Sequence, residues 1–180
     1  MEAGNGGCFM FTSSTAATLE QITEQWTVGD RTGWHDAPKL RVRVCSSVEK
    51  HAAEQRAEQE QAQALEQAQQ SRQLVVEGLA NDRYHLMGVY QLMEGKVVNG
   101  RAVWQKQGGT QELFLYNANN SMWHVSKREQ MEKGEATGFM FLATAALTPD
   151  QARPPEVCKL DDGRGQFVEA AEARFVTSHD

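Results

Sequence analysis

The stretch FMFTSSTAATLEQ, residues 9–21, returns at residues 139–151 as FMFLATAALTPDQ. The two stretches align without a gap, and six of their thirteen positions are identical. The match continues with small gaps through Trp26-Thr27-Val28 and Cys158-Lys159-Leu160, Trp34 and Phe167, and Leu40-Arg41-Val42 and Ala173-Arg174-Phe175. An internal repeat indicates that one supersecondary unit is used twice. We therefore expect residues 7–44 and 137–177 to share one strand order, with each Phe-Met-Phe triplet in a buried strand.

The two copies are unequal in length. Residues 78–180 predict a complete antiparallel meander, because short β-type segments alternate with turn signals such as Asn99-Gly100. Residues 1–45 match only the second half of that module, and half a β-module leaves a strand edge unsatisfied. Three explanations are open: residues 1–45 dock onto the complete module, another chain supplies the missing half, or the chain is a fragment of a longer repeat protein with a partial terminal repeat at residues 1–45. We favour the last.

A segment typical of one long helix separates the copies. Ser46-Ser47-Val48-Glu49 has the capping-box form, and neither Gly nor Pro follows until Gly78. We expect a helix over about residues 47–75 that is a solvated spacer rather than a dimerising coiled coil, because Gln and Glu fill too many seam positions. The predicted fold is mainly β with one long α-helix, in antiparallel meander modules in partial tandem repeat. Its parts are a partial β-module at 1–45, a helical linker at 46–77 and a complete β-module at 78–180.

Composition argues against several classes of partner. The net charge is −6 and no region is basic, so a nucleic-acid partner lacks its usual electrostatic attraction. The longest apolar run, residues 138–147, is too short to cross a bilayer, and the first residues do not resemble a secretory signal. Cys8, Cys45 and Cys158 are widely spaced, as expected for free thiols in a reducing compartment. We expect a cytoplasmic protein that binds neither nucleic acid nor membrane.

No catalytic or metal-binding constellation is recognisable in the sequence. The five histidines are isolated from one another and from the cysteines, so no zinc-type ligand set is formed. Asp161-Asp162-Gly163 lacks the alternating acidic positions of a calcium loop and fits a hairpin turn. The glycine-rich stretches lack the Lys and Ser/Thr of a phosphate loop. We therefore expect no enzymatic activity, no cofactor and no metal.

A series of short motifs resembles a repeated β-module of large, mostly uncharacterised algal and protist proteins. The motifs are Gly88-Val89-Tyr90, Val98-Asn99-Gly100-Arg101, Val103-Trp104, Leu113-Phe114-Leu115-Tyr116, Trp123-His124-Val125 and Thr148-Pro149-Asp150. The resemblance covers residues 80–177, and residues 4–44 for the second half of the module. It implies a repeated β architecture and no established activity. The chain departs from the pattern at Cys158, where the N-terminal copy keeps Trp26, which implies a looser core in the C-terminal copy.

Residues 113–125 also resemble a kelch repeat, in which a strand ending in Tyr is followed by a turn and a Trp. A propeller needs several blades, and this chain supplies at most two.

Aromatic residues on successive predicted strands are the candidates for contact with a ligand or partner, together with one histidine. They are Tyr90, Trp104, Tyr116, Trp123 and His124. Aromatics at strand spacing are more often core than platform. His124, however, alternates with its apolar neighbours, so we expect it to face solvent or a groove.

Two functions follow from these features. The first is a non-catalytic protein-interaction or scaffold module whose partner is a protein, either another copy of itself or a different chain. The alternative is a carbohydrate or small-ligand binding module appended to a larger protein, with a glycan as the partner. Solvent-exposed and coplanar Trp104 and Trp123 would favour the alternative, whereas burial of both rings would remove its support.

Overall fold

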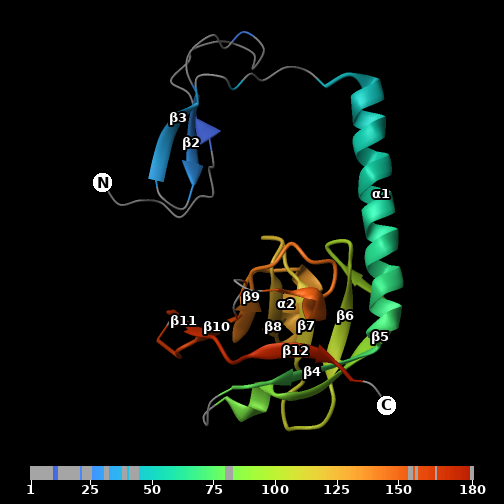
Figure 1. Cartoon of the computed structure of the whole chain (residues 1–180), viewed down its shortest axis with the longest axis vertical. Coiled ribbons are helices and arrows are strands. Elements are labelled where there is room, and N and C mark those ends of the chain that lie inside the picture. Colours follow the sequence, from blue (N-terminus) through green and yellow to red (C-terminus); the bar gives the residue numbers. More distant parts are fainter. Residues whose placement is uncertain are drawn as a thin grey trace. The chain divides into compact units, whose positions relative to one another are not determined.

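The computed structural model describes residues 10–11, 21, 26–30, 33–37, 40, 45–79, 83–153, 156, 158–164 and 166–178. It is mainly β with one long helix, α1 (Ser47–Gln70), as the sequence predicted (Figure 1). The chain forms two compact units, residues 1–54 and residues 55–180. The division between the two units falls inside α1.

The N-terminal unit contains a small antiparallel sheet. Its strands are β1 (Met10–Phe11), β2 (Trp26–Asp30) and β3 (Gly33–Ala37), in the order β1-β2-β3. Trp26 is buried in this unit, whereas Trp34 is 52% exposed. The expected third segment of the repeat, residues 40–42, lies outside the described residues apart from Leu40, and so does Cys8.

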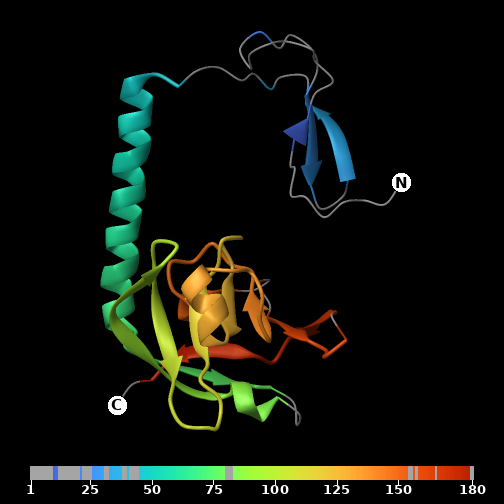
Figure 2. The same cartoon turned by 180° about the vertical axis from the view of Figure 1, so that it is seen from behind.

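The C-terminal unit is built on one curled antiparallel sheet of nine strands, in the order β11-β10-β9-β8-β7-β6-β5-β4-β12 (Figures 1 and 2). The strands are β4 (Gln73–Glu77), β5 (Gly88–Val98), β6 (Arg101–Lys106), β7 (Phe114–Asn117), β8 (Trp123–Ser126), β9 (Met140–Leu142), β10 (Cys158–Asp161), β11 (Phe167–Ala170) and β12 (Arg174–Thr177). A short helix, α2 (Arg128–Lys133), and two 3-10 turns, η2 (Tyr84–Leu86) and η3 (Pro149–Gln151), complete the unit. A continuous sheet of this size differs from the four-stranded blades of a kelch propeller.

Helix α1 begins as predicted but ends earlier. Ser46 Oγ accepts a hydrogen bond from Glu49 N at 3.2 Å, and Ser46 N donates to the Glu49 carboxylate at 3.0 Å, which completes the capping box. The helix stops at Gln70, and the last residues of the predicted linker form β4. There, Leu74 and Val76 alternate into the core, so burial on the sheet outweighs the helical composition of the preceding segment.

The last turns of α1 pack on the sheet, while the preceding turns are solvated. Ala64 and Ala68 are each 1% exposed, and Leu65 lies against the main core. Residues 53–63 are all exposed. The prediction of a solvated helix therefore holds for its middle, and small alanine side chains let its end approach the strands.

Asp150 joins three segments of the C-terminal unit. Its Oδ2 accepts hydrogen bonds from Ser71 Oγ at 2.9 Å and from Thr177 Oγ1 at 2.7 Å. Trp104 Nε1 donates to the Ser71 carbonyl at 2.8 Å. The turn after α1, the 3-10 turn η3 and strand β12 are thus held at one carboxylate, which gives the Thr-Pro-Asp motif a structural role.

Both faces of the nine-stranded sheet carry buried side chains. The inner face holds the main core, in which Trp104 and Trp123 meet edge to face with ring centroids 5.7 Å apart. The outer face carries a second cluster around Phe114 and Tyr116, which Met131 of α2 covers. Figure 2 shows α2 lying against these central strands. The outer face is therefore covered at β6 and β7 by a helix only six residues long.

Candidate partner-binding surface

The structure places all five predicted contact residues in the core. Tyr90, Trp104, Tyr116 and Trp123 are 0% exposed, and His124 is 2% exposed. The rings of Trp104 and Trp123 are neither exposed nor coplanar, since their planes meet at 69°. These residues belong to successive strands, as predicted, but they form no stacking platform at the surface.

The polar atoms of the four large aromatics are satisfied inside the protein. Tyr90 Oη donates to the Leu86 carbonyl at 2.7 Å, and Tyr116 Oη donates to the Glu135 carbonyl at 2.7 Å. Trp123 Nε1 donates to the Ala146 carbonyl at 3.3 Å. Burial raises the pKa of Tyr116 to about 12 and that of Tyr90 still further, so both phenols stay protonated. These side chains act as internal hydrogen-bond donors.

His124 points away from the inner core, as strand alternation predicts, yet it is buried. Its ring stacks on Phe141, with centroids 5.5 Å apart and planes at 24°, and lies 6.4 Å from the ring of Tyr116. Its Nε2 is 3.2 Å from Asn120 Nδ2, while Nδ1 has no hydrogen-bond partner in the described structure. Burial lowers the pKa of His124 to about 4, so the ring is neutral near pH 7. The expectation that it faces solvent or a groove was wrong because neighbouring strands cover it with aromatic rings.

The outer face becomes more exposed from β8 toward the edge strand β11. The register pairs His124 with Phe141, Phe141 with Lys159, and Lys159 with Glu169, so these residues form one row across four strands. Phe141 is half-buried and contacts Phe167 edge to face, with ring centroids 4.8 Å apart. Phe167 is 43% exposed. Two phenylalanine rings in contact therefore lie on the outer face of β9 and β11, beside the charged residues of this row.

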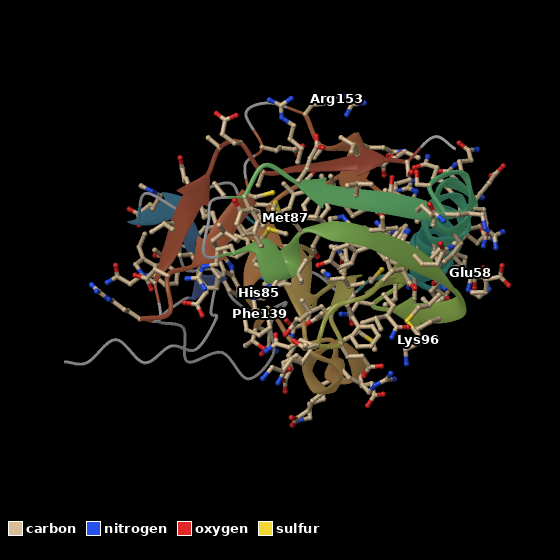
Figure 3. All side chains as sticks on the ribbon, turned by 90° about the horizontal axis from the view of Figure 1, so that it is seen from below. Glu58, His85, Met87, Lys96, Phe139 and Arg153 are labelled. Carbon is tan, nitrogen blue, oxygen red and sulfur yellow. The ribbon has the colours of Figure 1, made fainter. Side chains whose placement is uncertain are left out.

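The Phe139-Met140-Phe141 triplet is less uniformly buried than the sequence suggested. Met140 is fully buried, whereas the two phenylalanines are half-buried. Figure 3 shows the ring of His85 close to Phe139, and their centroids are 5.9 Å apart. Phe139 packs against the main core, whereas Phe141 lies on the outer face next to Phe167. The triplet therefore contributes one core residue and two residues that border solvent.

The small N-terminal sheet presents an aromatic residue at the equivalent position. Trp34 aligns with Phe167. Trp34 is the second residue of β3, and Phe167 is the first residue of β11. Trp34 pairs with Gly29, and a Cβ atom added to Gly29 would lie 3.0 Å from Trp34 Cζ3. The glycine therefore lets the indole lie close over the neighbouring strand. We call Trp34, Phe141 and Phe167 the aromatic corners of the two sheets.

The sequence prediction did not include these corners because it selected aromatics on the successive strands β5–β8. Those strands are covered on both faces, so their large side chains are buried. The usable signal was the alignment itself. An aromatic followed by an acidic residue two positions later occurs in both copies, as Trp34 with Asp36 and as Phe167 with Glu169. Because residues two positions apart lie on the same face of a strand, the aromatic and the acidic residue share one face in each copy.

The cysteines differ in accessibility. Cys45 is exposed and Cys158 is buried, and both are free. Burial raises the pKa of the Cys158 thiol to about 12, so it remains protonated and unreactive near neutral pH. A cleft of about 440 Å³ borders Cys158, the residue that aligns with Trp26 of the N-terminal copy. Within the described residues, no three His, Cys, Asp or Glu side chains are grouped as metal ligands, and no helix combines the length and apolarity needed to cross a membrane.

A polar cleft of about 520 Å³ lies beside α1 and the β5–β6 turn. Arg101 forms an ion pair with Glu60 at its wall. The adjacent Asn99 has a positive φ of 48°, and its Nδ2 donates to the carbonyls of Asn117 at 3.0 Å and Gly134 at 3.2 Å. The Asn-Gly-Arg motif thus forms the predicted hairpin turn and anchors it to the end of α2.

Comparison of the chain with protein-family models, with curated proteins and with solved structures gave no match.

Proposed function

We propose that this protein is a non-catalytic protein-interaction or scaffold module, built from β-modules in partial tandem repeat, that contacts a protein partner through its aromatic corners. The observation that carries the proposal is the exposure of Trp34 and Phe167, 52% and 43%, at aligned positions of the two sheets. A single large aromatic side chain that is exposed is common on protein surfaces and does not by itself indicate a contact site. Its recurrence at one position of two matching sheets favours a shared contact role.

The pairing of the strands supports the repeat. In the N-terminal sheet Phe11 faces Thr27 and Met10 faces Val28. The aligned residues of the C-terminal sheet have the same partners, since Phe141 faces Lys159 and Met140 faces Leu160. Because a shift of one residue would reverse every side chain, agreement of register is a stricter criterion than agreement of strand number.

The second hairpins agree in the same way. Trp26 faces Ala37 and Val28 faces His35 in the N-terminal sheet. The aligned pairs of the C-terminal sheet are Cys158 with Ala170 and Leu160 with Val168. The match therefore extends from the first strand through the third.

Burial of an aromatic corner by a partner would contribute measurably to the free energy of binding. Full burial of a phenylalanine side chain contributes about 1.5–3 kcal/mol relative to exposure. Each 1.4 kcal/mol corresponds to about a tenfold change in affinity. Contact through the corners of both sheets would raise the avidity for a partner that reaches both.

The test uses photocrosslinking from the corners. Benzoylphenylalanine is introduced at Trp34 or at Phe167, with Tyr84, which is 58% exposed, as the matched control position. The expected result is that both corner positions crosslink to the same protein and that the control does not. Equal crosslinking from all three positions, or none from the corners, would refute the assignment.

Direct binding is then measured with the purified partner and full chains. Phe167→Ser is expected to weaken binding by about three- to ninefold, because a partner can bury only the 43% of this side chain that is exposed. Val48→Ser, at a position that is 75% exposed on α1, is expected to bind like the wild type. Circular dichroism of each variant shows whether the fold is retained.

A carbohydrate or small polar ligand is the second candidate, and the polar cleft beside α1 is the observation that favours it. Its lining includes Asn99, Arg101, Asn117, Ser121 and Thr144, which offer hydrogen-bond donors and acceptors to hydroxyl groups. The fluorescently labelled chain would be applied to an array of glycans. Binding that Arg101→Ala abolishes would support this function, and the absence of any bound glycan would count against it.

A further inference from the structure

Strand β1 has one neighbouring strand among the described residues, whereas its aligned strand β9 has two. β9 lies between β8 and β10, and β1 pairs with β2, the strand aligned with β10. The side of β1 that corresponds to the β8 side of β9 is therefore an open sheet edge within the described part of the chain. Open edges are templates for further strands.

The C-terminal sheet shows which kind of strand this edge accepts. In the β8–β9 pairing, Val125 faces Met140 and His124 faces Phe141. Met140-Phe141 is identical to Met10-Phe11 at the aligned position. A strand of the Trp-His-Val type would therefore meet β1 in the same register as β8 meets β9.

The backbone groups of β1 have a defined direction. Asp161 N donates to the Phe139 carbonyl at 2.9 Å. Since backbone groups alternate between the two sides of a strand, the N–H of Met140 points toward β8 and that of Phe141 toward β10. Because β1 and β2 share the register of β9 and β10, we expect the N–H of Met10 to point away from β2, as that of Met140 points away from β10.

We infer that the open edge of β1 is a strand-addition site for a hairpin of the β7–β8 type carried by a separate polypeptide. The occupant is an antiparallel hairpin whose outer strand alternates apolar residues on one face with a histidine on the other. A second copy of this chain has no free strand of this type in its described residues, because its β8 already pairs with β7 and β9. The inference rests on the proposed repeat and names the partner that completes the half module.

The experiment uses the full chain and a labelled peptide of residues 112–127, which spans β7 and β8, with two lysines added at each end for solubility. A peptide of scrambled sequence is the control. The expected result is saturable binding with one peptide per chain by fluorescence anisotropy and sedimentation. Met10→Pro, which removes one outward N–H, is expected to weaken binding by about tenfold. Met10→Ala keeps that N–H and is expected to bind more tightly than the proline variant.

Three results would overturn the inference. These are equal binding of the scrambled peptide, equal affinity of the two Met10 variants, and a dimer of the chain alone that Met10→Pro dissociates. The last would assign the edge to a second copy. Photocrosslinking from Trp34 and Phe167 reports on third strands, away from this edge, so a failed peptide experiment leaves the test of the proposed function separate.

Discussion

Acid should destabilise the C-terminal unit through His124 before its carboxylates titrate. The pKa of this ring is about 4 in the folded protein, against an ordinary value of 6.5. The unfolded chain therefore binds the proton more tightly than the folded chain, and protonation favours unfolding. The contribution of His124 to stability is complete above about pH 6.5 and is lost as the pH falls toward 4.

The magnitude follows from the shift. Each pKa unit corresponds to about 1.4 kcal/mol, so the full effect reaches about 3 kcal/mol below pH 4 and about 2 kcal/mol at pH 5. The pKa values of Glu112 and Glu129 are lowered, by hydrogen bonds from Arg128 and Lys133 respectively. Their contributions are lost only below their ordinary pKa near 4.5. The interval from pH 7 to pH 5 therefore lies above the range in which these two carboxylates titrate, and the comparison with a variant that lacks the His124 ring isolates its contribution.

The assay is urea unfolding at pH 7, 6 and 5, followed by near-ultraviolet circular dichroism. The free energy of unfolding of the wild type is expected to fall by about 2 kcal/mol between pH 7 and pH 5. That of His124→Phe is expected to fall little, because a phenylalanine ring has no group that titrates. His51→Gln, at an exposed site on α1, serves as the control and should follow the wild type. Parallel pH profiles for the wild type and His124→Phe would refute the reasoning.

Three further predictions concern the hydrogen-bond network, the turns and the thiols. Asp150→Ala should lower the free energy of unfolding by about 3 kcal/mol in a denaturant titration, because two hydroxyl donors lose a carboxylate acceptor. Gly134→Ala should cost about 2 kcal/mol in the same assay, since this residue has a φ of 64° and an added Cβ would lie 2.7 Å from Asn99 Nδ2; an unchanged midpoint would contradict the close approach. Iodoacetamide at pH 7.5 should modify Cys45 and spare Cys158 until urea is added, as peptide mass spectrometry would show.

Sequence patterns predicted the features that depend on local chemistry. The start of α1 follows from the reciprocal bonds of Ser46 and Glu49, and the Asn99-Gly100 turn follows from the positive φ angles that those residues tolerate. The class of the fold also followed, because alternation and turn signals persist through residues 84–126. These features need no knowledge of distant contacts.

The features that depend on distant contacts were not predictable. The end of α1 is decided by the pairing of β4 with both β5 and β12, and β12 is a strand about 100 residues later in the chain. The burial of His124 depends on its contact with Phe141. The two residues are far apart in the sequence, because the connection from β8 to β9 includes α2. For the candidate surface, the sequence selected residues on β5–β8, whereas the aromatic corners lie on β3, β9 and β11. Period-two alternation separates the two faces of a strand without indicating which of them is covered.

The pairing of β12 with β4 has a mechanical consequence. Thr177 faces Leu74, and Ser178 N donates to the Gln73 carbonyl at 3.0 Å, so the end of the last strand lies beside the start of the first. A tensile load applied through α1 and through Ser178 would first separate Thr177 from Leu74. It would then separate the remaining residue pairs of β4 and β12 one after another. Strands loaded in this geometry peel apart one pair at a time instead of resisting in shear, so the unit would yield at low force. Extension of the unit would therefore begin at the β4–β12 pair.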